Sequence, residues 1–181
     1  MTTKLSDEII SFLERSSTEL FLNSAKQFVE LVEIENIANE EFYIKAHTAL
    51  INLYLAGHNL EQIDLKYSNT ESYFGDVDNE LFKTQNTRLS SLGQDSIYWE
   101  VFDPIYEKEN ELTQGWLVDD FADIYRDLKI ELDKIYKIGT DEAIEDALWQ
   151  LKWSFIHHWG NHCIDALRAL HYLNYDGKKT M

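Results

Sequence analysis

A chain of 181 residues, of which 44% are hydrophobic and 13% aromatic, can bury a core of its own, so the composition excludes an intrinsically disordered protein. Its 33 acidic and 16 basic residues give a formal net charge of −17, which repels phosphate backbones and anionic membrane surfaces. We therefore expect no nucleic-acid partner and no membrane partner.

The start of the chain and its cysteine content favour the cytoplasm. Residues 1–8 turn acidic at once and lack the apolar stretch that is typical of a signal peptide. Cys163 is the single cysteine and cannot form an intramolecular disulfide, so nothing indicates secretion. No apolar run approaches the roughly 20 residues that span a bilayer. We expect a cytoplasmic protein.

Scarce helix breakers predict long helices, because proline occurs once and glycine seven times. Ser6 can cap a first helix, and an apolar stripe at three- and four-residue steps follows it. An interruption at residues 16–18 can divide this stripe into two helices. Residues 39–56 predict the next helix, and residues 76–92 predict a weaker one.

The middle of the chain gives a mixed signal. Residues 96–104 are rich in aromatic and β-branched side chains, which favour a strand by propensity. A lone strand has nothing to pair with, so we expect a short helical or extended segment. A charged loop at residues 108–114 should follow it.

Two long helices complete the expected fold, the first over about residues 116–137 and the second over about 141–173, with Thr140 as its cap. Because the link between them is short, they should pack as antiparallel neighbours. The sequence therefore predicts an all-α, single-domain helical bundle of five to seven helices over residues 1–181. Its ordered core should span about residues 5–174.

Three stretches, mostly in the second half of the chain, carry a recognisable pattern. They are Tyr98 to Pro104, the run Asp119-Asp120-Phe121-Ala122-Asp123-Ile124-Tyr125-Arg126-Asp127, and the run from His158-Trp159-Gly160-Asn161-His162 to His171. Together they resemble a family of bacterial proteins of about this length that is known only as a domain of unknown function. The resemblance implies a small helical bacterial protein and implies no activity.

Histidines and aspartates gather on the last two predicted helices. His158, His162 and Asp165 follow one another at steps of four and three residues, so their side chains can converge on one point. This spacing is acceptable for ligands of zinc, manganese or iron, which makes the three residues candidate metal ligands. The alternative is a structural network, in which a core histidine bonds Asp165 or a neighbouring helix.

The preceding helix supplies further polar groups near the edge of its apolar face. A carboxylate from it should face His162, because buried polar groups need partners. The full candidate cluster consists of Asp120, Asp123, Asp127, His158, His162, Asp165 and Arg168.

Two shorter acidic patterns resemble parts of magnesium sites. Asp119-Asp120-Phe121-Ala122-Asp123 matches the D-D-x-x-D of helical prenyl-diphosphate enzymes, but those enzymes need basic residues around the diphosphate. A solvated acidic helix face is the simpler expectation. Glu142 and Glu145 match half of the paired E-x-x-E helices of nucleotide pyrophosphohydrolases, but they stand at a helix start, where acids complement the helix dipole.

Two classes of function remain open. The preferred class is an acidic helical bundle that acts through a protein partner or as a homodimer, which the surplus of aromatic residues favours. The alternative is a metal-dependent hydrolase or metal-binding protein that uses the histidine–aspartate cluster. No cofactor is expected apart from a candidate divalent metal, and no motif selects a substrate.

Overall fold

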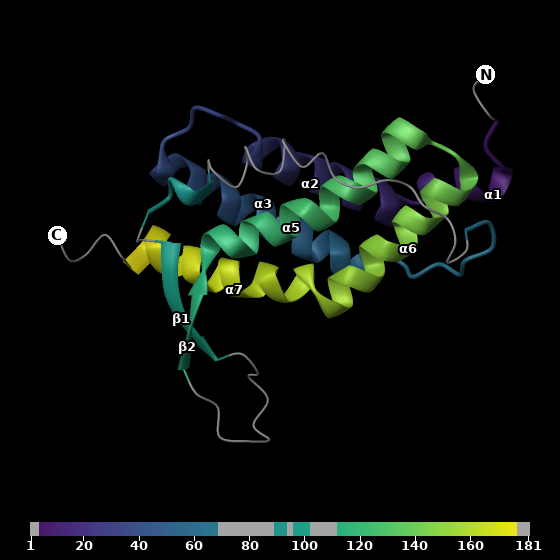
Figure 1. Ribbon diagram of the computed structural model, residues 1–181. Helices are drawn as coiled ribbons and strands as arrows, with labels where there is room; N and C mark the ends of the chain where they lie inside the picture. Colours follow the sequence, from purple (N-terminus) through teal and green to yellow (C-terminus); the bar gives the residue numbers. More distant parts are fainter. Residues whose placement is uncertain (1–3, 69–88, 94–95, 102–111, 177–181) are drawn as a thin grey trace.

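The computed structural model describes residues 4–68, 89–93, 96–101 and 112–176 (Figure 1). These residues contain six α-helices and one antiparallel pair of strands. In chain order they are α1 (Asp7–Leu13), α2 (Ser16–Val32), α3 (Asn39–Asn59), β1 (Ile97–Val101), β2 (Leu112–Trp116), α5 (Leu117–Asp133), α6 (Asp141–His157) and α7 (Trp159–His171). One π-helical turn follows α5 (Lys134–Ile138) and another follows α7 (Tyr172–Asp176). The predicted helical bundle of five to seven helices is confirmed.

The helices pack around one aromatic core. Helix α2 lies against α3 and α5, and α7 lies against α3, α5 and α6. Phe42 and Phe121 meet edge to face with ring centroids 5.3 Å apart, and Trp159 is fully buried beside Phe21. Each large aromatic ring removes on the order of 150–250 Å² from water, so these contacts hold α2, α3, α5 and α7 together.

The predicted caps are present at two helix starts. The Ser6 hydroxyl accepts a hydrogen bond from the backbone N–H of Ile9, and the Thr140 hydroxyl accepts one from Ala143. The carboxylate of Asp141 in turn accepts from the backbone N–H of Ser6, which joins the start of α1 to the start of α6. The apolar stripe at the N-terminus is divided into α1 and α2, as the sequence indicated, but the break lies at residues 14–15, and residues 16–18 begin α2.

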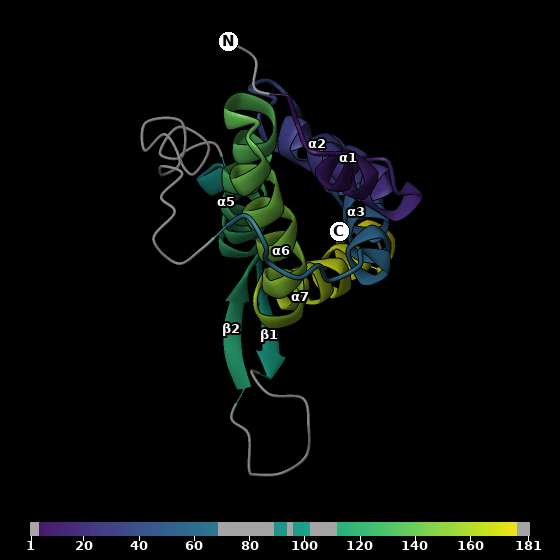
Figure 2. The ribbon, with the colours of Figure 1, turned by 90° about the vertical axis from the view of Figure 1, so that its right-hand side faces the viewer.

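The segment at residues 96–104 was expected to be helical or extended without a pairing partner, and the lack of a partner was wrong, because residues 97–101 form a paired strand. Strand β1 pairs with β2 in antiparallel register, with Ile97 opposite Trp116 and Val101 opposite Leu112. The partner strand comes from the end of the stretch that was expected to be a charged loop. Figure 2 shows this hairpin standing away from the helices.

The predicted single helix over residues 141–173 is in fact two helices. His158 leaves the helical region, with φ −144° and ψ −89°, and separates α6 from α7. Gly160 permits the break, because a Cβ at this position would overlap the carbonyl oxygen of Phe155. The weaker helix predicted at 76–92 falls mostly outside the described residues. In the part of the chain that the structure describes, every helix is too short or too polar to cross a membrane.

Glu145 is a buried structural carboxylate and not half of a metal-binding pair. Its Oε2 accepts hydrogen bonds from the backbone N–H groups of Tyr67 and Ser68, both at 2.7 Å. The side chain therefore joins the end of the 60–68 segment to α6. Glu142, one turn earlier, is exposed.

Replacing Glu145 with alanine should lower the free energy of unfolding by about 2 kcal/mol, because two buried backbone N–H groups lose a charged acceptor. Urea denaturation followed by circular dichroism measures this change. The matched control is Glu142→Ala, one turn earlier in α6, which should change stability by less than about 0.5 kcal/mol. Equal effects of the two substitutions would contradict the structural role of Glu145.

Candidate metal centre

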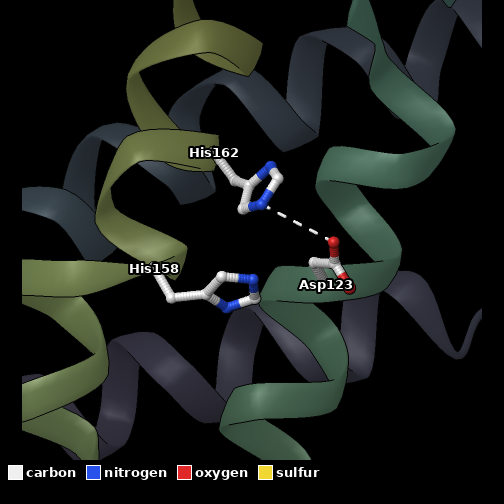
Figure 3. Close-up of side chains that lie close together, drawn as sticks. All are labelled: Asp123, His158 and His162. Carbon is white, nitrogen blue, oxygen red and sulfur yellow. Dashed lines mark ion pairs between the residues drawn. The ribbon is translucent and has the colours of Figure 1, made fainter. Parts of the chain in front are cut away.

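Helices α5 and α7 run alongside each other and bring two histidines and an aspartate together (Figures 1 and 3). Asp123 comes from α5, His162 from the first turns of α7, and His158 from the junction between α6 and α7. One ligand atom from each lies within 4.8 Å of the others. Figure 3 shows the two imidazole rings on one side and the Asp123 carboxylate opposite them.

Both histidines use the same ring nitrogen to bind a carboxylate of α5. Nδ1 of His162 lies 2.9 Å from Oδ1 of Asp120, and Nδ1 of His158 lies 2.7 Å from Oδ2 of Asp127. An ionised carboxylate can only accept, so each Nδ1 donates its proton. In each ring this leaves Nε2 for another partner, and in His162 that nitrogen is 3.5 Å from Oδ2 of Asp123.

Asp120 is the buried member of this group. Its side chain also accepts a hydrogen bond from the hydroxyl of Tyr98, at 2.7 Å. Burial raises the pKa of Asp120, while the hydrogen bonds from His162 and Tyr98 lower it and do not fully offset that rise. The same contact acts on the imidazole: the hydrogen bond to Asp120 raises the pKa of His162 above its ordinary value, against the opposing effect of burial.

Tyr98 is a site residue that the sequence reasoning did not select. It lies on the face of β1 that points to the helices, opposite Gly115 of β2. A Cβ at Gly115 would overlap the Tyr98 ring, so glycine lets the ring lie flat against β2. Burial, together with the negative charge of Asp120, raises the pKa of Tyr98. The signal was available: apolar Ile97, Trp99 and Val101 alternate with Tyr98 and Glu100, a two-residue period typical of a strand.

The two carboxylate oxygens of Asp123 have different partners. Oδ1 pairs with the guanidinium of Arg126 at 2.7 Å, and Oδ2 faces His162. In the D-D-x-x-D run, Asp119 is exposed, Asp120 is buried and Asp123 is half-buried. The expected solvated acidic face thus describes Asp119 only.

The structure does not place Asp165 and Arg168 in the three-residue group. Asp165 lies one turn beyond His162 and is half-buried, and its pKa is raised to about 6 by burial, with further contributions from the charges of Glu100 and Asp120. Arg168 is exposed, and its charge acts weakly against that rise. Asp123 occupies the position beside the histidines that the sequence spacing had suggested for Asp165.

Two imidazole nitrogens and one carboxylate oxygen form a donor set that suits zinc, manganese or iron. All three side chains are partly exposed, so water can reach the space between them. Three protein ligands leave coordination positions open, which is the arrangement of catalytic zinc sites and not of closed structural ones.

Comparison with known proteins agrees with the fold. The profile of a family described as a domain of unknown function, DUF5063, matches residues 13–176. The crystal structure of protein BF1032 from Bacteroides fragilis is similar to this chain, with a TM-score of 0.75 and 22% sequence identity over 94% of this chain and 99% of that chain. A search of curated proteins gave no match. At this identity the likeness concerns the fold alone.

Replacing Asp120 with asparagine should lower the pKa of His162, because an amide cannot stabilise the imidazolium while burial still disfavours it. In the native protein this pKa lies above its ordinary value of about 6.5. The charged His162 therefore contributes its full stability to the fold below its ordinary pKa of about 6.5. This contribution is lost as the pH rises through the pKa of His162 in the folded protein.

An NMR titration of the imidazole resonances measures the pKa of His162 directly. The control is Asp119→Asn, which removes an exposed charge that acts on His162 more weakly than Asp120 and should lower this pKa much less. A pKa of His162 that is the same with and without the Asp120 carboxylate would contradict the assigned hydrogen bond.

Proposed function

This chain belongs to the family described as a domain of unknown function, DUF5063, and because that membership brings no activity, we propose from its own geometry that it binds a divalent metal ion through Asp123, His158 and His162. The proposal extends to a metal-dependent hydrolase. When bound, the ion would supply a Lewis acid and lower the pKa of a coordinated water molecule.

The proposed metal site is supported by one observation above all: both histidines have Nδ1 bound to a carboxylate of α5. Metal-binding histidines usually donate their second ring N–H to a carboxylate or carbonyl oxygen, which sets the tautomer and the ring orientation. In this protein Asp120 and Asp127 are the carboxylates that accept these hydrogen bonds. The nitrogen that remains for a metal is Nε2 in both rings.

The distance between His162 and Asp123 also favours a shared metal ion over a direct hydrogen bond between the two side chains. Nε2 of His162 and Oδ2 of Asp123 are 3.5 Å apart, which is long for a charge-assisted hydrogen bond. Two ligands bound to one tetrahedral ion at about 2.0–2.1 Å each lie roughly 3.3–3.5 Å apart. The separation therefore matches two ligands of a shared ion.

In a hydrolytic site of this kind, the residues of the chain would have separate tasks. Asp123, His158 and His162 would hold the ion, and Asp120 and Asp127 would orient the imidazoles. Arg126 pairs with Oδ1 of Asp123, which would leave Oδ2 of that carboxylate to bind the ion.

Tag-free protein treated with a chelator and then titrated with Zn²⁺ or Mn²⁺ should bind one ion per chain by calorimetry. The ion should also stabilise the fold, by about 2.7 kcal/mol when the free ion is at 100 times its Kd. His162→Ala and Asp123→Asn should each abolish both effects, because each removes one of only three protein ligands.

The matched control is His157→Ala. His157 is the neighbour of His158 in sequence, but its ring is exposed and lies against Trp153, outside the cluster. This variant should bind the ion as the native protein does. If His162→Ala instead lowers stability by about 1–3 kcal/mol and the native protein binds no ion, the cluster is a structural network and the proposal is wrong.

A second candidate function is association with a protein partner or a second copy of the chain, the class that the composition favours. Its support is a set of large apolar side chains that are exposed on β1 and β2 and on α6. The net charge of −17 continues to disfavour nucleic acid. We also propose the cytoplasm as the location, since Cys163 is the single cysteine and can form no intramolecular disulfide.

A further inference from the structure

The two faces of the β1–β2 hairpin have opposite character. Tyr98 and Gly115 lie on the inner face, which is anchored to α5 by the hydrogen bond from Tyr98 to Asp120. Alternate residues form the outer face: Ile97, Trp99 and Val101 of β1 with Leu112, Gln114 and Trp116 of β2. All six of these are exposed.

We propose that this outer face is the surface through which two copies of the chain associate, packed face to face about a two-fold axis. The inference rests on the second proposed function, association, and names its surface and its occupant. It is independent of the metal proposal, because none of the six residues belongs to the metal centre.

The apolar surface is just large enough for a specific interface. Trp99 is 62% exposed and Leu112 is 69% exposed, and both are more exposed than Ile97 and Trp116. The five apolar side chains together leave on the order of 500 Å² in water, the upper range for the largest patch on a monomer. Two such faces in contact would bury about 1,000 Å², which is the lower bound of a specific interface.

The character of the face selects a second copy over a partner of opposite charge. The chain has a net charge of −17, yet the six outer-face positions contain no acidic or basic residue. A basic partner would find no carboxylate on this face to pair with. An apolar face is complementary to itself, and closed two-fold symmetry brings the same residues together from both copies.

Face-to-face packing is preferred over pairing of strand edges. In the described residues the sheet has two strands, so each has one free edge. Pairing through an edge would leave Trp99 and Leu112 in water. It would also gain little from the free N–H and C=O groups of the edge, because water can bond these groups in the monomer. Packing two faces about 10 Å apart removes the apolar side chains from water instead.

Sedimentation equilibrium of the chelator-treated full chain, over a range of protein concentrations, tests the inference. The native protein should be a dimer. Trp99→Glu should raise the dissociation constant about 30-fold or more, because it places a charge at the centre of the interface. Leu112→Lys, which changes a different strand and introduces the opposite charge, should do the same.

The matched control is Trp153→Glu on α6, a tryptophan that is also exposed, at 44%, but lies outside the hairpin. It should leave the dimer intact. Circular dichroism of each variant checks folding, and the loss of dimer must occur in at least one hairpin variant that keeps the native helical spectrum. Added salt should strengthen the native dimer, because it screens the repulsion between two strongly acidic chains.

The outcomes distinguish a failure of association from a failure of the hairpin face as the dimer interface. A native protein that is monomeric at every concentration overturns association itself and the inference with it. A dimer that survives Trp99→Glu and Leu112→Lys in folded protein leaves association in place and shows that the hairpin face is not its surface. A dimer that dissociates as salt is added overturns the apolar interface, because it would indicate contacts between opposite charges.

Discussion

Asp120 is a buried carboxylate with two partners, and its position determines how three parts of the molecule meet. The Tyr98 hydroxyl reaches it from the hairpin, and Nδ1 of His162 reaches it from α7. A carboxylate on its own would be costly at this depth, because an unpaired buried charge loses its hydration. The two contacts offset part of that cost, and they fix the docking of the hairpin on α5 and the direction of the His162 ring together.

Two acidic clusters along α5 show how the chain compensates buried negative charge in different ways. Near the end of the helix, Lys134 lies 2.8 Å from Glu131 and 2.7 Å from Asp146, so a cation of the chain itself neutralises the carboxylates. Burial nevertheless raises the pKa of Glu131 to about 7. At the other cluster the cationic partners are imidazoles, which are neutral or charged according to pH. An external cation could complete that cluster, whereas the lysine already completes the first.

The sequence predicted the bundle because helical periodicity, caps and scarce breakers all agree. It also predicted that aspartates of one helix would face His158 and His162, since the residues lie at the edges of two apolar stripes. Two features could not be predicted from local pattern. The pairing of β1 with β2 joins residues on either side of Pro104, so it depends on contacts distant in sequence. The break at His158 is permitted by Gly160, where a Cβ would overlap the carbonyl oxygen of Phe155, and it moves His158 off the helix on which Asp165 lies.

The hairpin connects the two proposals physically. A two-stranded sheet is marginally stable in water without another layer to pack on. Here its inner face is held by Tyr98 on Asp120, and Trp116 donates to the hydroxyl of Ser96. Covering the outer face would stabilise the strands, and with them the Tyr98 contact that helps to hold Asp120 against His162. By linkage, a ligand that orders His162 and a second copy that orders the hairpin would then favour each other, because both stabilise the same arrangement of Asp120.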